Sequence, residues 1–136
     1  MRPPVLGARP SIVREDLLTS EAIRPDGVVI REITPEELKG RVEREDSLLL
    51  VDVREPFERH LADLPDLGQI QIPVKEIPLR GPALDPNAEI VVYCRSGPRS
   101  AWATERLMEM GFKRVVNLRG GLLAWRAEVD ANLPRY

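Results

Sequence analysis

Continuous apolar runs and one alternating run mark the expected strands of this chain. Residues Ser47–Val53 and Glu89–Cys94 are almost entirely apolar over the length of a single strand. Such runs are typical of strands that are buried on both faces of a sheet. The alternation in Gln69–Pro73 predicts another strand, and the run Arg114–Leu118 predicts a fourth.

Helix signals separate these strands. The first predicted helix follows Thr34, a good N-cap residue, with Pro35 at the first helical position and Glu37 completing a capping box. Three further helices are expected at residues 54–64, after a turn at Pro56, at residues 99–111, which Gly111 ends, and at residues 120–129, after a double glycine. Strands that alternate with helices predict a parallel sheet covered on both faces.

The chain divides into two unequal parts. Residues 1–30 contain four of the thirteen prolines and keep no clear apolar period, so we expect an arm or linker there. Within this arm, residues 11–23 can form a short helix. Residues 31–136 are expected to form a single α/β domain, because a chain of 136 residues is long enough for one domain with its own core.

Composition and charge exclude several classes of protein. The formal net charge of -2 argues against a nucleic-acid surface, which needs a basic excess. The longest apolar runs reach only strand length, so no membrane span is expected. The first residues lack the apolar segment of a secretory signal, so we expect a cytoplasmic protein. A single cysteine cannot form an internal disulfide, and we expect neither a metal nor another cofactor.

The only cysteine lies where a buried strand ends and positive charge begins. Ligand sites of parallel sheets lie beyond the carboxyl ends of the strands, where Cys94 is expected. The next helix should begin near Pro98, with its free N–H groups and partial positive charge toward this point. A turn at Gly97 can curl N–H groups into an anion-binding nest, and Arg95 and Arg99 add full charges. These features favour a thiolate, so an acidic and nucleophilic Cys94 is expected.

An inert buried thiol is the alternative interpretation. A lone cysteine in an apolar strand usually packs as a small hydrophobic residue. The residues that follow argue against it, because burial of an inert thiol requires neither two arginines nor a glycine turn. The candidate site is therefore the catalytic residue Cys94 with the substrate-binding residues of the next loop, which are Arg95, Ser96, Gly97, Pro98, Arg99 and Ser100.

Four segments resemble the motifs of the rhodanese domain, in that domain's order and spacing: DVREPFE, CRSGPRS, GFKRVVNLRGG and GGLLAW. The similarity runs from about Ile33 to the end of the chain. It implies an α/β fold with a central five-stranded parallel sheet and helices on both faces. It also implies a sulfurtransferase whose Cys94 takes a sulfur atom from a donor and carries it as a persulfide. Asp52 and Arg54 would support the loop, with a plain salt bridge as an equal alternative.

The two ends of the chain resemble one particular group of rhodanese domains. The ending GGLLAWRAEVDANLPRY is similar to rhodanese domains fused to adenylyltransferases that serve sulfur-carrier proteins of molybdopterin or thiamine-type biosynthesis. The beginning PPVLGARPSI resembles the tail of the adenylyltransferase, but Pro3 and Leu6 replace its zinc-binding cysteines, so no zinc is expected. The resemblance implies thiosulfate or a cysteine desulfurase as sulfur donor, and cyanide as acceptor in vitro. It implies a ubiquitin-like sulfur-carrier protein or an adenylyltransferase as partner.

Two other functions fit the same fold. Phosphatases and arsenate reductases need five residues between the cysteine and the arginine of the loop, whereas four separate Cys94 from Arg99. A binding module without catalysis is the second alternative, although such modules commonly lose the cysteine. Ala62 and Asp63 stand where many rhodaneses have glycine and histidine, which changes one wall of the site.

The remaining candidates are interpreted as structural. His60 lies in a charged helix, where we expect a solvated side chain and no catalytic base, since a thiolate already formed needs none. Trp102 and Trp125 stand at helical positions that predict core packing. Gly120 and Gly121 are interpreted as the turn that lets the last helix start.

Overall fold

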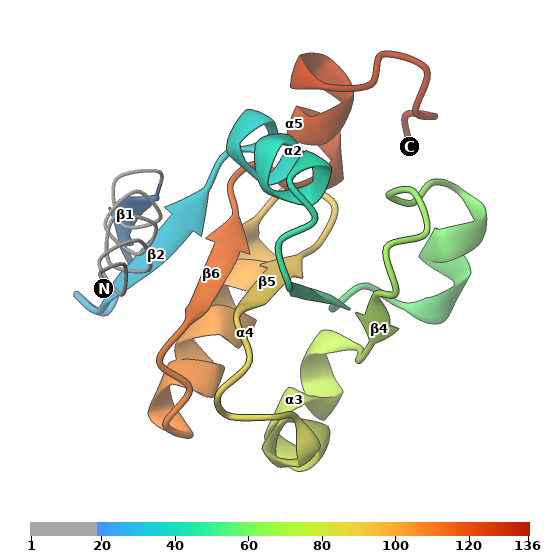
Figure 1. Ribbon diagram of the computed structural model, residues 1–136. Coiled ribbons are helices and arrows are strands. Elements are labelled where there is room, and N and C mark those ends of the chain that lie inside the picture. Colours follow the sequence, from blue (N-terminus) through green and yellow to red (C-terminus); the bar gives the residue numbers. More distant parts are fainter. Residues whose placement is uncertain (1–18) are drawn as a thin grey trace, which may run out of the picture.

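A computed structural model describes residues 19–136, which form a six-stranded sheet in the order β1-β2-β6-β5-β3-β4 (Figure 1). The strands are β1 (Ser20–Ile23), β2 (Val29–Ile33), β3 (Leu49–Asp52), β4 (Ile70–Gln71), β5 (Ile90–Tyr93) and β6 (Val115–Leu118). Five neighbouring strands pair in parallel, in the order β2, β6, β5, β3 and β4 across the sheet. Strand β1 pairs antiparallel with β2. The expected five-stranded parallel sheet is confirmed, and one antiparallel strand extends it.

The helices are α2 (Pro35–Glu43), α3 (Ile77–Arg80), α4 (Pro98–Glu109) and α5 (Gly121–Glu128), with the 3-10 turns η1 (Pro56–His60), η2 (Val74–Glu76) and η3 (Gly81–Ala83). The helices that follow residues 34, 97 and 120 begin where local signals place them, whereas the helix expected at residues 54–64 is only a 3-10 helix at Pro56–His60 and α3 was not expected. The Thr34 hydroxyl accepts from the Glu37 N–H at 3.1 Å, and the Glu37 carboxylate accepts from the Thr34 N–H at 2.8 Å. The predicted capping box is therefore confirmed, and Gly111 follows α4 with a φ of 99°.

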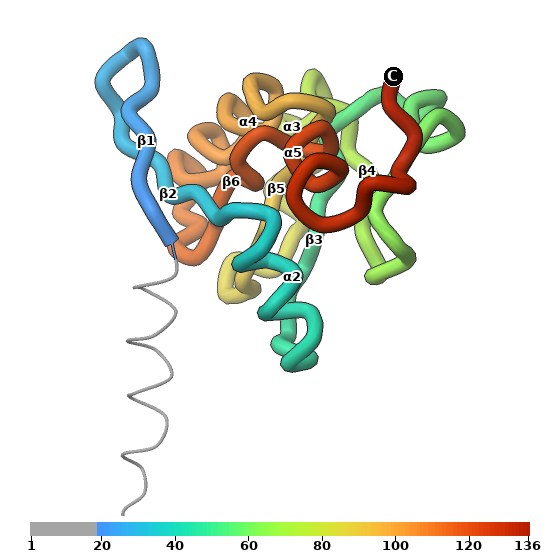
Figure 2. The backbone as a smooth tube through the Cα atoms, turned by 90° about the horizontal axis from the view of Figure 1, so that it is seen from above, coloured from blue at the N-terminus to red at the C-terminus, as the bar shows by residue number. Residues whose placement is uncertain are grey.

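Alternation along the strands divides the core between the two faces of the sheet. Val91 and Tyr93 of β5 pack with the side that carries α2 and α5. Val92 and Cys94 point to the other side, where α3 and α4 lie. Figure 2 shows α2 and α4 on opposite sides of the sheet. The cysteine thus belongs to the face that α4 covers.

The sheet extends into the predicted N-terminal arm. Strand β1 pairs with β2 in the register Ser20 to Glu32 and Ile23 to Val29. The short helix expected over residues 11–23 is wrong for residues 20–23, and residues 11–18 lie outside the described part. Every second side chain of β1 is exposed, because this edge strand has few neighbours to pack against. The division of the chain near residue 30 stays a prediction.

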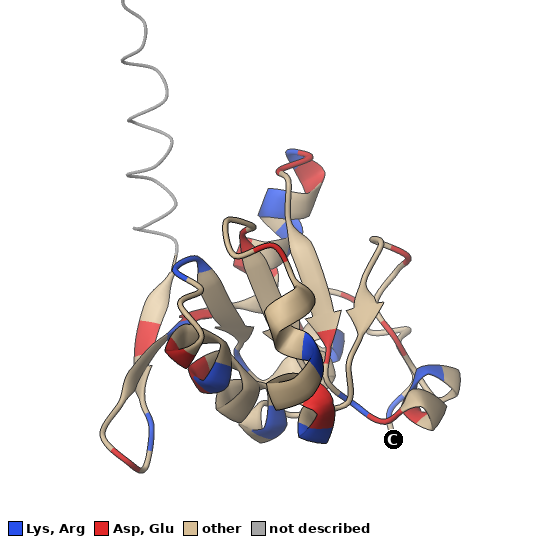
Figure 3. Cartoon of the chain, turned by 90° about the horizontal axis from the view of Figure 1, so that it is seen from below, with Lys and Arg blue, Asp and Glu red and all other residues tan. Residues whose placement is uncertain are grey.

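The charged residues are spread over the molecule. Figure 3 shows basic and acidic positions interspersed along the helices and loops. Within residues 19–136, no helix is both long and apolar enough to cross a membrane.

Candidate active site

The candidate site lies at the edge where the parallel strands end. Cys94 follows the last residue of β5, and only 1% of it is exposed. Asp52 ends the neighbouring strand β3 and pairs with Tyr93 in the parallel ladder. The segment 95–97 then turns directly into α4, whose first residue is Pro98. This geometry is the one expected for a ligand site of a parallel sheet.

Three donors of the loop converge on the sulfur of Cys94. The Gly97 N–H donates to Sγ at 3.1 Å, the Ser100 N–H at 3.4 Å and the Ser100 hydroxyl lies at 3.3 Å. Gly97 has a φ of 121°, a conformation that side chains rarely adopt, which lets the chain curl back over the sulfur. Convergent N–H groups at a helix start suit a negative charge on sulfur.

The start of α5 packs against the back of this loop. The Leu122 N–H donates to the Cys94 carbonyl oxygen and the Leu123 N–H to that of Arg95, both at 3.0 Å. A Cβ at Gly121 would lie 2.5 Å from the Cys94 oxygen, and Gly121 has a φ of 59°. The predicted glycine turn therefore has a second role, because only a residue without a side chain allows this contact.

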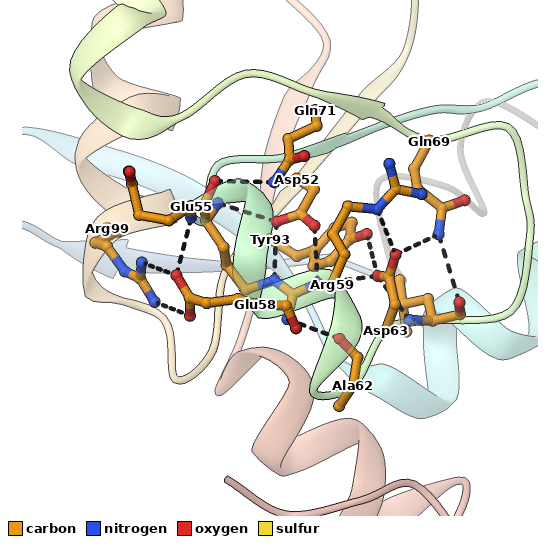
Figure 4. A network of polar contacts seen from close by, with 12 residues as sticks. Asp52, Glu55, Glu58, Arg59, Ala62, Asp63, Gln69, Gln71, Tyr93 and Arg99 are labelled. Carbon is orange, nitrogen blue, oxygen red and sulfur yellow. Dashed lines mark hydrogen bonds and ion pairs between the residues drawn. The ribbon is translucent and has the colours of Figure 1, made fainter.

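Arg99 is held by an acid that was not predicted. Its guanidinium donates to both carboxylate oxygens of Glu58, at 2.8 and 3.0 Å, as Figure 4 shows. These hydrogen bonds from Arg99 lower the pKa of Glu58 to about 2, and the same pair raises the pKa of Arg99. About a third of the Arg99 side chain stays exposed. Glu58 therefore orients the guanidinium while one side of it faces solvent.

The other loop arginine, Arg95, contacts the C-terminal segment. Its guanidinium donates to the backbone oxygen of Tyr136 and lies 5.2 Å from the centre of that ring. Ser96 and Pro98 are exposed, whereas Ser100 is fully buried. The loop predicted to bind substrate therefore has an exposed rim and a buried base next to the sulfur.

Asp52 and Arg54 form a buried ion pair behind the site. Both side chains are 0% exposed, and the guanidinium donates to both Asp52 oxygens at 2.8 and 2.9 Å. Burial opposes the charge on Arg54, but Asp52 and Tyr136 raise its pKa overall. Arg54 also donates to the carbonyl oxygens of Glu58 and Ala62, at 3.3 and 2.9 Å. These contacts are those expected from the salt-bridge interpretation. Arg54 is linked to the cysteine loop indirectly, because it contacts Glu58 and the Glu58 carboxylate binds Arg99.

The segment that departs from the usual rhodanese pattern closes the same network. The Asp63 carboxylate accepts from the Tyr93 hydroxyl at 2.7 Å and from Arg54 at 3.1 Å (Figure 4).

The exposed His60 lies on the outside of η1. Of the two tryptophans, Trp125 is buried in the core, while Trp102 is half-buried.

A shallow apolar groove lies beside the loop. It has a volume of about 530 Å³ and is lined by Arg24, Val74, Lys75, Pro98, Arg99 and Trp102. Trp102 forms one wall and also stacks with Arg106, whose guanidinium lies 5.1 Å from the ring centre. Arg24 comes from the hairpin of β1 and β2 and pairs with Glu105 of α4 at 3.2 Å. Among residues 19–136, no cluster of His, Cys, Asp and Glu is suited to a metal ion.

Comparisons with known proteins agree with this geometry. The sequence profile described as "Rhodanese-like domain" matches residues 34–128. A protein named "Sulfurtransferase" from Allochromatium vinosum is 41% identical over 71% of this chain and 89% of its own length. "Probable adenylyltransferase/sulfurtransferase MoeZ" from Mycobacterium tuberculosis is 32% identical over 76% of this chain, which spans 26% of that protein.

The structural comparison gives the same result. The crystal structure of a rhodanese-like domain protein from Staphylococcus aureus superposes with a TM-score of 0.64 at 30% identity. The match covers 77% of this chain and 97% of the other. The sequence profile, the relatives and the arrangement of the cysteine loop thus lead to one conclusion: this chain belongs to the rhodanese-like family of sulfurtransferases.

Proposed function

We propose that this protein is a sulfurtransferase that carries sulfane sulfur as a persulfide on Cys94. The observation that carries the proposal is the convergence of the Gly97 N–H, the Ser100 N–H and the Ser100 hydroxyl on Sγ. Such donors stabilise an anion on sulfur in a site that is closed to water. The exposed side of Arg99 supports an anionic donor at the mouth of the loop.

The proposed reaction has two steps that return the enzyme to its first state. The Cys94 thiolate attacks the outer sulfur of thiosulfate, a new S–S bond forms, and sulfite leaves with the electron pair of the broken bond. An acceptor such as cyanide then attacks the outer sulfur, thiocyanate forms, and the electron pair returns to Sγ as the thiolate. A cysteine desulfurase persulfide can replace thiosulfate, with the desulfurase thiolate as leaving group.

In the cell, we propose a sulfur-carrier protein with a C-terminal glycine pair as the acceptor. Two relatives support this class: MoeZ, which is named as an adenylyltransferase and sulfurtransferase, and a Bacillus subtilis protein named "Putative sulfur carrier protein YrkF". An adenylyltransferase that activates the carrier is the second proposed partner. A reducing cytoplasm fits this chemistry, because it keeps a single thiol free to react.

Steady-state kinetics of thiocyanate formation tests the proposal. Varying thiosulfate at several cyanide concentrations should give parallel double-reciprocal lines, the pattern of a two-step mechanism with a covalent intermediate. Cys94→Ser, which keeps the size of the side chain, should abolish the reaction. Activity that survives in Cys94→Ser would exclude Cys94 as the carrier. A wild-type chain that forms no thiocyanate would favour the binding-module alternative.

The phosphatase alternative is tested with the same preparation. The loop has four residues between Cys94 and Arg99, one fewer than a phosphatase needs to enclose a phosphate. We therefore expect no release of phosphate from an aryl phosphate. Phosphate release without thiocyanate formation would reverse the choice between the two functions.

A further inference from the structure

The Ser100 hydroxyl lies among three acceptors but has one proton to donate. Its oxygen is 2.5 Å from Asn117 Oδ1, 3.0 Å from the Gly97 carbonyl oxygen and 3.3 Å from Cys94 Sγ. All four residues are buried. Because a hydroxyl donates only one hydrogen bond, it cannot satisfy Sγ and Asn117 at the same time.

Glu32 fixes the direction of the Asn117 amide. Strands β2 and β6 place these two residues opposite each other, and Asn117 Nδ2 lies 2.9 Å from Glu32 Oε2. Arg119 donates to the other oxygen of Glu32 at 3.1 Å. An ionised carboxylate only accepts, so the amide NH₂ must face Glu32 and Oδ1 must face Ser100. The 2.5 Å contact is therefore the hydrogen bond that Ser100 donates to Asn117 when Sγ carries no negative charge.

The charge on the sulfur changes this arrangement. A neutral thiol can direct its S–H at the Ser100 oxygen while Ser100 donates to Asn117. A thiolate can only accept, and it draws the Ser100 proton to Sγ. We propose that Asn117, held by Glu32, is a positioning residue that competes with Cys94 for the Ser100 proton. This competition sets the pH range in which Cys94 reacts.

The same competition would operate in both halves of the sulfur-transfer cycle. When Sγ carries a second sulfur atom it is neutral, and Ser100 donates to Asn117. When an acceptor removes that atom, negative charge returns to Sγ and the hydroxyl proton turns toward it. The stabilisation then appears as the charge develops, which favours the transition state over the persulfide. The inference rests on the proposed function only in this step and in taking Cys94 as the reacting group.

Other ionisable groups belong to the loop or to the elements around it. They are Arg95 and Arg99 of the loop and α4, Asp52 and Arg54 at the end of β3, Tyr93 of β5, Glu58 of η1, Tyr136 of the C-terminal segment, Glu32 of β2 and Arg119 of β6. The main variants of the test, Asn117→Leu and Ser100→Ala, substitute none of these ionisable residues.

Alkylation of Cys94 by iodoacetamide across a pH series measures the effect. The thiolate displaces iodide, and the chain has one cysteine, so the rate reports this site alone. Ser100→Ala should raise the pH of half-maximal rate by roughly one unit, because the thiolate loses a donor. Asn117→Leu should lower it by about half a unit, because the nearest competing acceptor is gone and only the Gly97 carbonyl oxygen, at 3.0 Å, still competes with Sγ. In the Ser100→Ala background, Asn117→Leu should have no effect.

Glu32→Gln gives an independent variant with a half-buried side chain, in case Asn117→Leu does not fold. The glutamine amide can donate to Asn117 Oδ1, so the Asn117 amide can turn its NH₂ toward Ser100 and release the hydroxyl proton. The half-maximal pH should fall again. In the Glu32→Gln background, Ser100→Ala should remove the part of the fall in half-maximal pH that depends on the Ser100 hydroxyl. The part that remains measures the effect of the lost Glu32 charge.

Two results would overturn the proposal: a half-maximal pH that does not fall in the folded variant, or a fall that persists in full without the Ser100 hydroxyl. Thermal unfolding of each variant identifies the folded ones. The assay needs no sulfur transfer. If the wild-type chain formed no persulfide, the proposed function would fail, while the alkylation result would still decide on Asn117.

Discussion

At the scale of single residues, the candidate site consists of the hydrogen-bond donors around Cys94 Sγ and of Arg99, which Glu58 binds. Gly97 and Ser100 were expected near Cys94, and both lie within hydrogen-bond distance of Sγ. Glu58 was not expected, because it stands 41 positions before Arg99 in a charged segment where one acid looks like its neighbours. Only the folded chain brings η1 next to the start of α4. The catalytic and binding roles of these residues stay predictions.

The ion pair of Glu58 and Arg99 predicts how stability depends on pH. The pKa of Glu58 is lowered in the folded protein, from 4.5 to about 2. The pair therefore stabilises fully above pH 4.5, and this contribution disappears as the pH falls toward 2. Glu58→Gln should lower the free energy of unfolding by about 2 kcal/mol at neutral pH, a value reduced for the partly exposed Arg99.

Urea unfolding of Glu58→Gln and the wild type at a series of pH values checks this prediction. The two curves should approach each other below pH 4.5 and meet near pH 2. A difference that stays constant over the whole pH range would show that the ionised carboxylate is not what stabilises the fold.

At the scale of elements, the apolar pattern of the sequence predicted the strands that are buried on both faces of the sheet. Strands β3 and β5 lie in continuous apolar runs, and β6 is apolar apart from Asn117. The capping residues of α2 and the glycine after α4 marked those helix ends. Strands β1 and β2 were missed because their segments SEAI and VIREI are short, contain charged residues and have neither a continuous apolar run nor a regular alternation. Helix α3 was missed because four residues are too few to show a helical period.

The junction between α5 and the cysteine loop gives a prediction at this scale. In Gly121→Ala the new Cβ would lie 2.5 Å from the Cys94 carbonyl oxygen, in addition to the strain of a positive φ. We expect a loss of at least about 2 kcal/mol in the free energy of unfolding, together with a marked loss of thiocyanate formation.

Gly68→Ala is the matched control for this change. Gly68 also has a positive φ, of 75°, but a Cβ there would meet nothing within 4 Å. It should cost about 1 kcal/mol through backbone strain and leave sulfur transfer unchanged. Equal effects of the two substitutions on stability and activity, measured by urea unfolding and by thiocyanate formation, would contradict the proposed packing of α5 on the loop.

At the scale of the whole molecule, the site depends on contacts between distant parts of the chain. The Tyr136 hydroxyl lies 2.8 Å from Arg54 and 2.9 Å from Glu58, residues that are about 80 positions earlier. Hydrogen bonds at such separations leave no local pattern, so the sequence predicted the sheet edge and the loop but not this covering segment. The family resemblance predicted the fold and the cysteine loop. The contacts of Tyr136 with Arg54 and Glu58 arise only from the packing of the folded chain.

Tyr136→Phe tests this long-range support. The substitution keeps the ring and removes the hydroxyl that links Arg54 and Glu58, so the free energy of unfolding should fall by about 1–2 kcal/mol. Because Tyr136 and Glu58 share a hydrogen bond, the loss in a double variant with Glu58→Gln should be smaller than the sum of the two single losses. Strictly additive losses in urea unfolding would show that the two residues act independently.

The central claim is that Cys94 carries sulfur, and the mass of the intact protein tests it most directly. After incubation with thiosulfate and removal of the excess, the wild-type chain should gain the mass of one sulfur atom. Cyanide should remove that mass and release thiocyanate, and Cys94→Ala should never acquire it. A wild-type chain that gains no sulfur, or a Cys94→Ala chain that gains the same sulfur, would contradict the account.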